Sequence, residues 1–503
     1  MVRWTIGALV TAAVLSPLSA QNTLPSVPQR LGLEEAVTLA RRFNPAWRRS
    51  ANDLEPAAWG TRNALTELLL PSVSASGSLN YAGAGSQTFL SQQFSQPSST
   101  IGSSYSLRLS WTLSGRTLTQ PGVARAQQHA AEAALDGADN GIRTGITQQY
   151  LTVLQAREQV GLAEVQLRRN QEFLRLAEAR YQVGQATQLD VRQAQVALGQ
   201  SEVALLQNQQ AVTVSMLRLF EQMGVPAPDD PLVVGLSDTF PVVEPTWELS
   251  RLLAEADASN PDLQALEAQA SAARWGARAA RSQWLPSVNL SAGWSGFTQQ
   301  FTNTEPLVTG AIAQAQAEAQ INQTECAFTN QAWLNPGATP LDCGALAFTP
   351  AVADAIRSQT VARNSAFPFD FTRQPFSAQL TVSLPLFTQL SRPLAVSQAQ
   401  AQAEDAQYFA EGRRLQLRTL VSEAFYGLRT AYATIGIQGT NREAAGEQLR
   451  LSTERYRVGS GTFFELLDAQ LAAQRAEADY INAIYAYHRA VAALEAAVGR
   501  PLR

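Results

Sequence analysis

Two hydrophobic periods alternate along the chain, one near three and a half residues and the other equal to two. The longer period fills residues 120–223 and 392–498, which are rich in Ala, Gln, Leu and Arg. An unbroken helix over 120–181 would reach roughly 90 Å at the rise of an α-helix. The returning arm of each stretch carries an apolar heptad stripe, which predicts antiparallel coiled-coil packing. The stripes are Val191, Ala194, Leu198, Leu205, Val212 and Leu219 in the first stretch, and Leu466, Ala469, Ala473, Ala476, Tyr480, Ala483, Tyr487 and Leu494 in the second.

The period of two predicts β-strands. It occupies the segments 72–81, 104–113, 287–295 and 376–384. In the first segment Val73, Leu79 and Tyr81 share one face, and serines fill the other. An apolar face opposite a face of small uncharged polar residues is typical of transmembrane barrel strands around a wet interior. The alternative is a soluble sheet packed on a core.

Four such segments are too few to close a barrel, because small closed barrels need about eight strands. After residue 20 the chain has no apolar run of about eighteen residues, so we expect strands to make any membrane crossing. Open sheet edges are not tolerated in lipid. We therefore predict that several copies assemble around a symmetry axis. Three copies would give twelve strands, and the sequence permits other counts.

The chain reads as an internal duplication. Asn44-Pro45 recurs as Asn260-Pro261. A repeat at this scale predicts two halves of similar structure. The predicted segments are a first repeat at 21–226, with a β-hairpin at 71–113 and a helical hairpin at 120–223; a Pro-rich equatorial linker at 227–248; and a second repeat at 249–503, with a β-hairpin at 286–387 and a helical hairpin at 392–498. Within the second β-hairpin, we read 297–375 as a long, exposed outer loop.

The two helical hairpins have matching turns, at Arg180–Gln195 (the first tip) and Arg455–Gln470 (the second tip). Each contains a Val-Gly pair at which glycine can end a helix in the left-handed conformation. Each also contains a Thr-x-x-acid capping box that starts the next helix. These pairs and boxes are Val183-Gly184 with Thr187 and Asp190, and Val458-Gly459 with Thr462 and Glu465.

The first twenty residues have the pattern of a secretory signal peptide, with Arg3 before a short apolar run and small residues ending at Ala20. The residue directly after this site is Gln21 and not a cysteine, so we do not expect a lipid anchor. The only cysteines are Cys326 and Cys343, and in an exported protein we predict that they form a loop disulfide. Two cysteines supply too few ligands for a metal site.

Charge and motifs exclude several functions. A formal charge of −4 and a pI near 5.5 argue against nucleic acid as a partner. The sequence contains no phosphate-binding loop, metalloprotease motif or nucleophile elbow. We therefore expect no enzymatic activity, no cofactor and no metal.

A duct needs selectivity at its narrowest point, and rings of carboxylates favour cations there. The candidates are Asp190, Glu465 and Asp468. Asp190 and Glu465 already have a structural explanation as capping-box acids. Asp468, one turn further on, has no capping role and is the stronger candidate for a residue that faces the lumen.

The Asn-Pro helix, the Leu-Pro-Ser strands and the duplicated Tyr-x-Val-Gly-x-x-Thr tips together resemble the TolC family of outer-membrane efflux proteins, over residues 30–501. The resemblance implies a mainly α-helical homotrimer with membrane β-structure. A twelve-stranded outer-membrane barrel would continue into a periplasmic barrel of coiled-coil helices. It also implies passive export with a periplasmic adaptor and an inner-membrane transporter of the RND, ABC or MFS type. The alternative is a non-conducting exported scaffold or adhesin.

The resemblance also assigns roles to residues of the tips. Tyr456 and Asp190 match the family's tyrosine-acid tie, and Glu465 and Asp468 match its acidic rings. The archetype has an arginine where this chain has Gly461, so one closing tie is missing. The residues matching the adaptor-docking grooves are Val183, Gly184, Val458 and Gly459.

Overall fold

The computed structural model describes residues 27–89, 92–96, 98–332, 337 and 339–502, so the predicted signal peptide lies outside the described residues. The chain divides into two compact units. Each unit combines segments from both halves of the chain. Unit 1 consists of Met1–Gly60, Ala124–Arg274 and Gln400–Arg503, and unit 2 of Thr61–Val123 and Trp275–Ala399.

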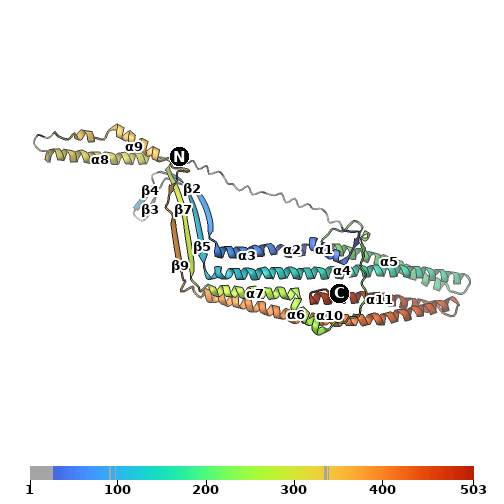
Figure 1. Cartoon of the computed structure of the whole chain (residues 1–503). Helices are drawn as coiled ribbons and strands as arrows, with labels where there is room; N and C mark the ends of the chain where they lie inside the picture. The colour runs from blue at the N-terminus through green and yellow to red at the C-terminus, as the bar shows by residue number, and fades with distance from the viewer. Residues whose placement is uncertain (1–26, 90–91, 97, 333–336, 338, 503) are drawn as a thin grey trace. The chain divides into compact units, whose positions relative to one another are not determined.

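Helices dominate unit 1, and α4 and α10 run on into it from unit 2 (Figure 1). Two long helical hairpins, α4–α5 and α10–α11, occupy the stretches with the longer hydrophobic period. Short helices precede each hairpin. The helices are α1 Leu33–Phe43, α2 Pro45–Asn52, α3 Leu54–Leu69, α4 Gly115–Gln182, α5 Gln188–Met223, α6 Leu249–Ser259, α7 Pro261–Ser282, α10 Ser391–Arg457 and α11 Phe463–Val498. In the linker, β6 (Gly235–Leu236) pairs in parallel with β1 (Arg30–Leu31).

The Asn-Pro motif holds the end of each hairpin that lies opposite its tip. Asn44 caps α2 by accepting from Ala46 N at 2.8 Å, and its amide donates to Gln222 O at 2.7 Å, near the end of α5. Asn260 repeats this contact by donating to Ala497 O of α11 at 2.9 Å. Each returning helix ends in a left-handed glycine, at Gly224 (φ 71°) and Gly499 (φ 88°). The Asn-Pro motif therefore closes each hairpin at a matching place.

Separate hydrophobic cores hold the two hairpins. One core joins α1, α4 and α5 around the fully buried Tyr150, Met216 and Phe220. The other joins α6, α10 and α11 around Leu428 and Leu494. Because buried apolar side chains contribute most of the stability of such helices, each hairpin is anchored by the short helix that precedes it.

Unit 2 is built on an antiparallel sheet. Its strand order is β2-β5-β7, and both β8 and β9 pair with β7. The strands are β2 Ser72–Ala82, β5 Thr100–Leu113, β7 Ser287–Phe301, β8 Thr372–Arg373 and β9 Ser377–Ser383. A small hairpin, β3 Gly85–Phe89 with β4 Gln92–Gln96, lies between β2 and β5 in sequence.

The strand register sorts the two faces of the sheet as the sequence pattern predicts. Val73 pairs with Leu109, and Leu109 with Ala292, so apolar residues line up across the strands. On the other face, the Ser76 and Ser106 hydroxyls lie 2.8 Å apart and form one of several cross-strand serine contacts. Among the described residues, β2 and β9 pair on one side only, which leaves both edges of the sheet open.

The segment that we read as an outer loop contains helices. Strand β7 extends to Phe301, and α8 (Glu305–Ala332) and α9 (Pro350–Arg363) follow. A disulfide between Cys326 and Cys343, with 5.6 Å between the Cα atoms, ties α8 to the short helix η2 (Cys343–Leu346). The helices of this long connection were not predicted because α8 lacks an apolar stripe, although its Ala and Gln residues favour helix on propensity alone.

Among the described helices, none is both long enough and apolar enough to span a bilayer.

Candidate functional site: the two hairpin tips

Both tips end their incoming helix with the same hydrogen bonds. Gly184 has a φ of 77°, Gly184 N donates to Tyr181 O at 3.0 Å, and Gln185 N donates to Arg180 O at 2.8 Å. In the second tip, Gly459 N donates to Tyr456 O at 3.2 Å and Ser460 N to Arg455 O at 2.9 Å. This pair of bonds is the Schellman motif, which requires a left-handed residue at the glycine position.

Both tips also start their outgoing helix with a reciprocal capping box. Asp190 N donates to Thr187 Oγ1 at 3.2 Å, and Thr187 N donates to the Asp190 carboxylate at 2.8 Å. Thr462 and Glu465 make the same pair of contacts at 3.2 and 3.4 Å. The two acids therefore hold the turns that the sequence assigns to them.

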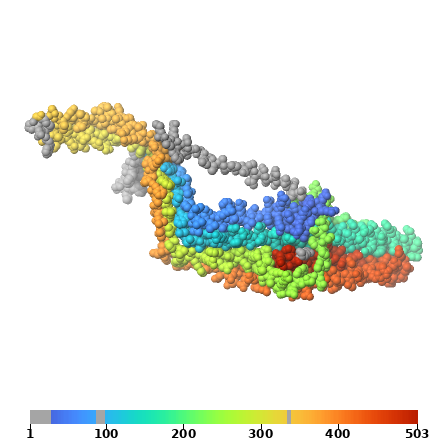
Figure 2. All heavy atoms as spheres, viewed as in Figure 1, coloured from blue at the N-terminus to red at the C-terminus, as the bar shows by residue number. Residues whose placement is uncertain are grey.

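A shared hydrophobic cluster joins the tips. All four arms contribute, and in Figures 1 and 2 both tips lie at the same end of unit 1. The buried members are Phe173 and Ala177 of α4, Ala194 of α5, Leu449 and Tyr456 of α10, and Phe463, Leu466, Ala469 and Ala473 of α11. Deeper along the hairpins, Gln470 donates to Asn170, and Arg169 lies 3.3 Å from Glu477. The two hairpins are thus packed together within one chain.

Arg180, on α4, crosses from the first tip to the second. Only 8% of the residue is exposed. One guanidinium nitrogen donates to Gln185 O at 3.0 Å, and another donates to the main-chain oxygen of Tyr456. The guanidinium carbon also lies 4.3 Å from the centre of the Tyr456 ring, within range of a cation–π contact.

Arg455 occupies the matching position in the second tip, but it is exposed and stays within its own turn. Its guanidinium lies 3.5 Å from the Glu465 carboxylate and 3.5 Å from Ser460 O. Exposed ion pairs of this kind contribute little to stability. Matching residues in the two tips therefore have different surroundings.

Tyr456 is buried, and its ring packs edge-on against Phe463 with 5.6 Å between the centroids. Burial, followed by the negative charge of Asp190, raises the pKa of its hydroxyl above the usual value. That hydroxyl is buried and has no hydrogen-bond partner among the described residues. The tyrosine-acid pair named by the resemblance is thus close enough for electrostatic interaction but is not hydrogen-bonded within the chain.

Asp468 is exposed and makes no ion pair or hydrogen bond among the described residues, so its charge is free. Val183 and Val458 are also exposed at the turns. Sequence analysis missed two further exposed apolar residues, Leu189 and Phe464, each the second residue of its outgoing helix. Their matching positions in the two tips were the available signal.

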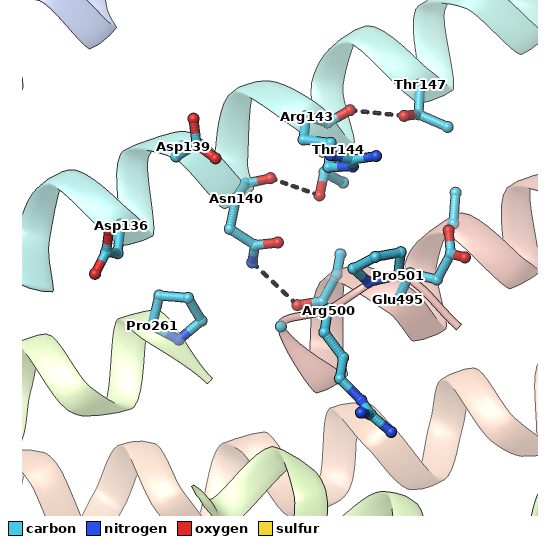
Figure 3. Close-up of a pocket in the computed structure, with 13 residues that line it drawn as sticks. Asp136, Asp139, Asn140, Arg143, Thr144, Thr147, Pro261, Glu495, Arg500 and Pro501 are labelled. Carbon is cyan, nitrogen blue, oxygen red and sulfur yellow. Dashed lines mark hydrogen bonds between the residues drawn. The ribbon is translucent and has the colours of Figure 1, made fainter. Parts of the chain in front are cut away.

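A polar pocket of about 230 Å³ lies far from the tips, between α4, the start of α7 and the end of α11 (Figure 3). The Asn140 amide crosses it to Ala496 O at 3.2 Å. Two of its lining charges form ion pairs: Asp139 with Arg41 at 2.5 and 2.6 Å, and Arg500 with Glu255 at 2.7 Å. We interpret this pocket as part of the structural contact between the first and second repeats.

Comparisons with known proteins agree with this architecture. Residues 50–225 and 349–500 match the family described as outer membrane efflux protein. The pyoverdine export outer membrane protein OpmQ of Pseudomonas putida is 32% identical over 199 residues, which cover 36% of this chain and 41% of that protein. The chain thus matches about two fifths of that relative's length.

Solved structures show the same fold. VceC of Vibrio cholerae, an outer membrane protein, superposes with a TM-score of 0.67 at 17% identity, covering 94% of this chain and 97% of that one. The CmeC outer membrane channel of Campylobacter jejuni gives a TM-score of 0.68 at 15% identity, covering 93% and 85%. The chain therefore belongs to the outer membrane efflux protein family and has the fold of its TolC-like channels.

Proposed function

We propose that the chain is the outer-membrane exit duct of an efflux or secretion system. It would act as a homotrimer and conduct passively, with a periplasmic adaptor and an inner-membrane transporter supplying the drive. The observation that carries this proposal is the sheet of unit 2, which has one apolar face, one hydroxyl-lined face and two open edges. Pairing β2 of one copy with β9 of the next would satisfy those edges, and three copies would close a twelve-stranded barrel.

The helices at the edges of the hairpins support the same assembly. On α5 and α10, exposed apolar residues recur every seven positions, on faces other than those buried within the chain. The stripes are Leu189, Val196 and Val203 on α5, and Ile437, Ala444 and Leu451 on α10. A sevenfold repeat is the pattern of a coiled-coil seam. We infer that α5 of one copy packs antiparallel against α10 of the next.

Within that trimer, the second tip would supply the constriction. Asp468 and Glu465 lie one turn apart on α11. Three copies of each would form acidic rings that favour cations. The exposed Val183-Gly184 and Val458-Gly459 turns would receive the adaptor. Matching tips within each chain, and the two separate segments matched by the family, support an internal duplication.

The OpmQ relative is named for pyoverdine export, which makes pyoverdine the first cargo to test.

Membrane extraction and cross-linking test the duct. We expect the mature chain to resist salt and alkali, to need detergent for extraction, and to run as a heat-modifiable trimer. The double variant Val196→Cys/Leu451→Cys should form covalent oligomers on oxidation, because the proposed seam brings these two positions of neighbouring copies together. The native cysteines are already bonded to each other, so only the introduced cysteines are available to cross-link. Val196→Cys/Arg450→Cys, which moves one cysteine off the stripe, is the matched control. Release by alkali as a monomer would indicate an exported scaffold instead.

A further inference from the structure

We propose that Arg180 is a latch residue that fixes the second tip of each chain to the first. By doing so it sets the position of the acidic residues on α11. This inference rests on the proposed duct function for its consequence, but not for its geometry. Among the described residues, no other side chain of the tips donates hydrogen bonds to the main chain of both turns.

The first argument comes from the two matching arginines. Arg180 and Arg455 stand at the same position before Tyr-x-Val-Gly, and both turns have the same backbone hydrogen bonds. If arginine were needed only to complete a turn, both side chains would remain local. Arg455 does remain local, whereas Arg180 is buried and reaches Tyr456 of the other hairpin.

The second argument is electrostatic. Helices α4 and α10 both end at this point, and their last carbonyls carry partial negative charge. The Arg180 guanidinium donates to Tyr456 O in the last turn of α10 and to Gln185 O in the turn that follows α4. Bonds from a buried cation to carbonyls are stronger than neutral hydrogen bonds. Separating the tips would break the bond to Tyr456 O and leave only the bond to Gln185 O, within the first tip.

The third argument is how Tyr456 is held. Its hydroxyl has no partner among the described residues, while its ring lies under Arg180 and against Phe463. The ring face and the main-chain oxygen therefore fix Tyr456, and the hydroxyl does not. Phe463 begins α11, the helix that carries Glu465 and Asp468, so the contact extends directly to the proposed constriction.

A distance measurement between the tips tests the latch without requiring conduction. Spin labels at Gln182 and Arg457, the exposed last residues of α4 and α10, report on the separation of the tips. Labelled chains are diluted with unlabelled chains so that only distances within one chain contribute. Double electron–electron resonance should give one narrow distribution for the otherwise native chain. Arg180→Gln should broaden it, with a roughly tenfold rise in the separated population for each 1.4 kcal/mol lost.

The matched control is Arg455→Gln, which should leave the distance distribution narrow. Arg180→Lys keeps the charge but not the planar fork, and should give an intermediate distribution. If Arg180→Gln does not assemble, the distance distribution of Arg180→Lys decides the test instead. A distribution for Arg180→Gln or Arg180→Lys as narrow as that of the native chain would overturn the latch.

Planar-bilayer recordings separate failure of the latch from failure of the duct. With the native chain conducting, Arg180→Gln should raise the time-averaged conductance by severalfold, because the constriction is released. An unchanged current in that variant overturns the latch alone. A native chain that never conducts contradicts the duct, and the distance measurement then decides the latch.

Discussion

The two hairpin tips have closely similar sequence patterns and nearly the same backbone, yet their corresponding arginines do different things. Each tip has a left-handed glycine, a pair of Schellman bonds and a Thr-x-x-acid capping box. In the first tip the arginine is buried and reaches across to the second, whereas in the second it is exposed and pairs locally. Local sequence therefore fixes the turns, and the packing of one hairpin on the other decides which arginine becomes structural.

The largest expected difference between the tips comes from replacing each arginine with glutamine. Arg180→Gln should lower the stability of the protein by about 2–4 kcal/mol, because it removes two charge-assisted hydrogen bonds and the cation–π contact of a buried side chain. Arg455→Gln should change it by less than about 1 kcal/mol, since its ion pair is exposed. Thermal unfolding followed by circular dichroism in detergent measures both. Equal shifts in the midpoint would contradict the proposed asymmetry.

Alanine at the two turn glycines should instead show the tips to be alike. Gly184→Ala and Gly459→Ala should each cost about 1–2 kcal/mol, the usual cost of a left-handed L-residue. A Cβ at Gly184 meets nothing within 4 Å, and one at Gly459 meets only the Arg180 guanidinium, at 3.5 Å. The same unfolding assay measures the pair. A much larger loss at one glycine would show that its turn has a tertiary role absent here.

The capping threonines give a smaller and equally symmetric effect. Thr187→Ala and Thr462→Ala should each lower stability by about 1 kcal/mol, because each removes one cap to a helix N-terminus. Serine at either position keeps the hydroxyl and serves as the control. If only Thr462→Ala were destabilising, the first capping box would not be needed to hold its turn.

The smallest effect is expected for Tyr456→Phe. Removing a buried hydroxyl that has no partner among the described residues should change stability by less than about 1 kcal/mol, or raise it. The phenylalanine ring keeps the face on which Arg180 lies. The distribution of distances between the tips, measured by double electron–electron resonance, should therefore stay narrow. A broadened distribution would indicate that the hydroxyl, rather than the ring, holds the second tip.

Much of the fold follows from the hydrophobic period along the chain and from the residues at the turns. Serine alternation near Val73 predicts the strand and which of its faces is apolar, and the threonines predict where α5 and α11 begin. The helices at 305–363 were missed because α8 has helix-forming residues without an apolar stripe. Such a segment gives no signal for packing, so the length of the connection alone suggested a loop.

The contacts between the two hairpin tips were harder to predict from the sequence. The capping roles of Asp190 and Glu465 follow from spacing, because their partners lie three residues away. The crossing of Arg180 to Tyr456 joins residues 276 positions apart, and nothing in either tip distinguishes Arg180 from Arg455. Only the packing of α4 against α10 and α11 selects between them, and that packing is a property of the tertiary structure.

The most direct test of the duct is the reversal potential of the purified trimer in a planar bilayer under a salt gradient. The native chain should conduct and favour cations, and Asp468→Asn should weaken that preference, because its exposed carboxylate is not paired within the described chain. Asp479→Asn, an acid further along α11, is the matched control and should change the potential less. A native trimer that does not conduct, or a cation preference unchanged by Asp468→Asn, would contradict a duct whose selectivity lies at the second tip.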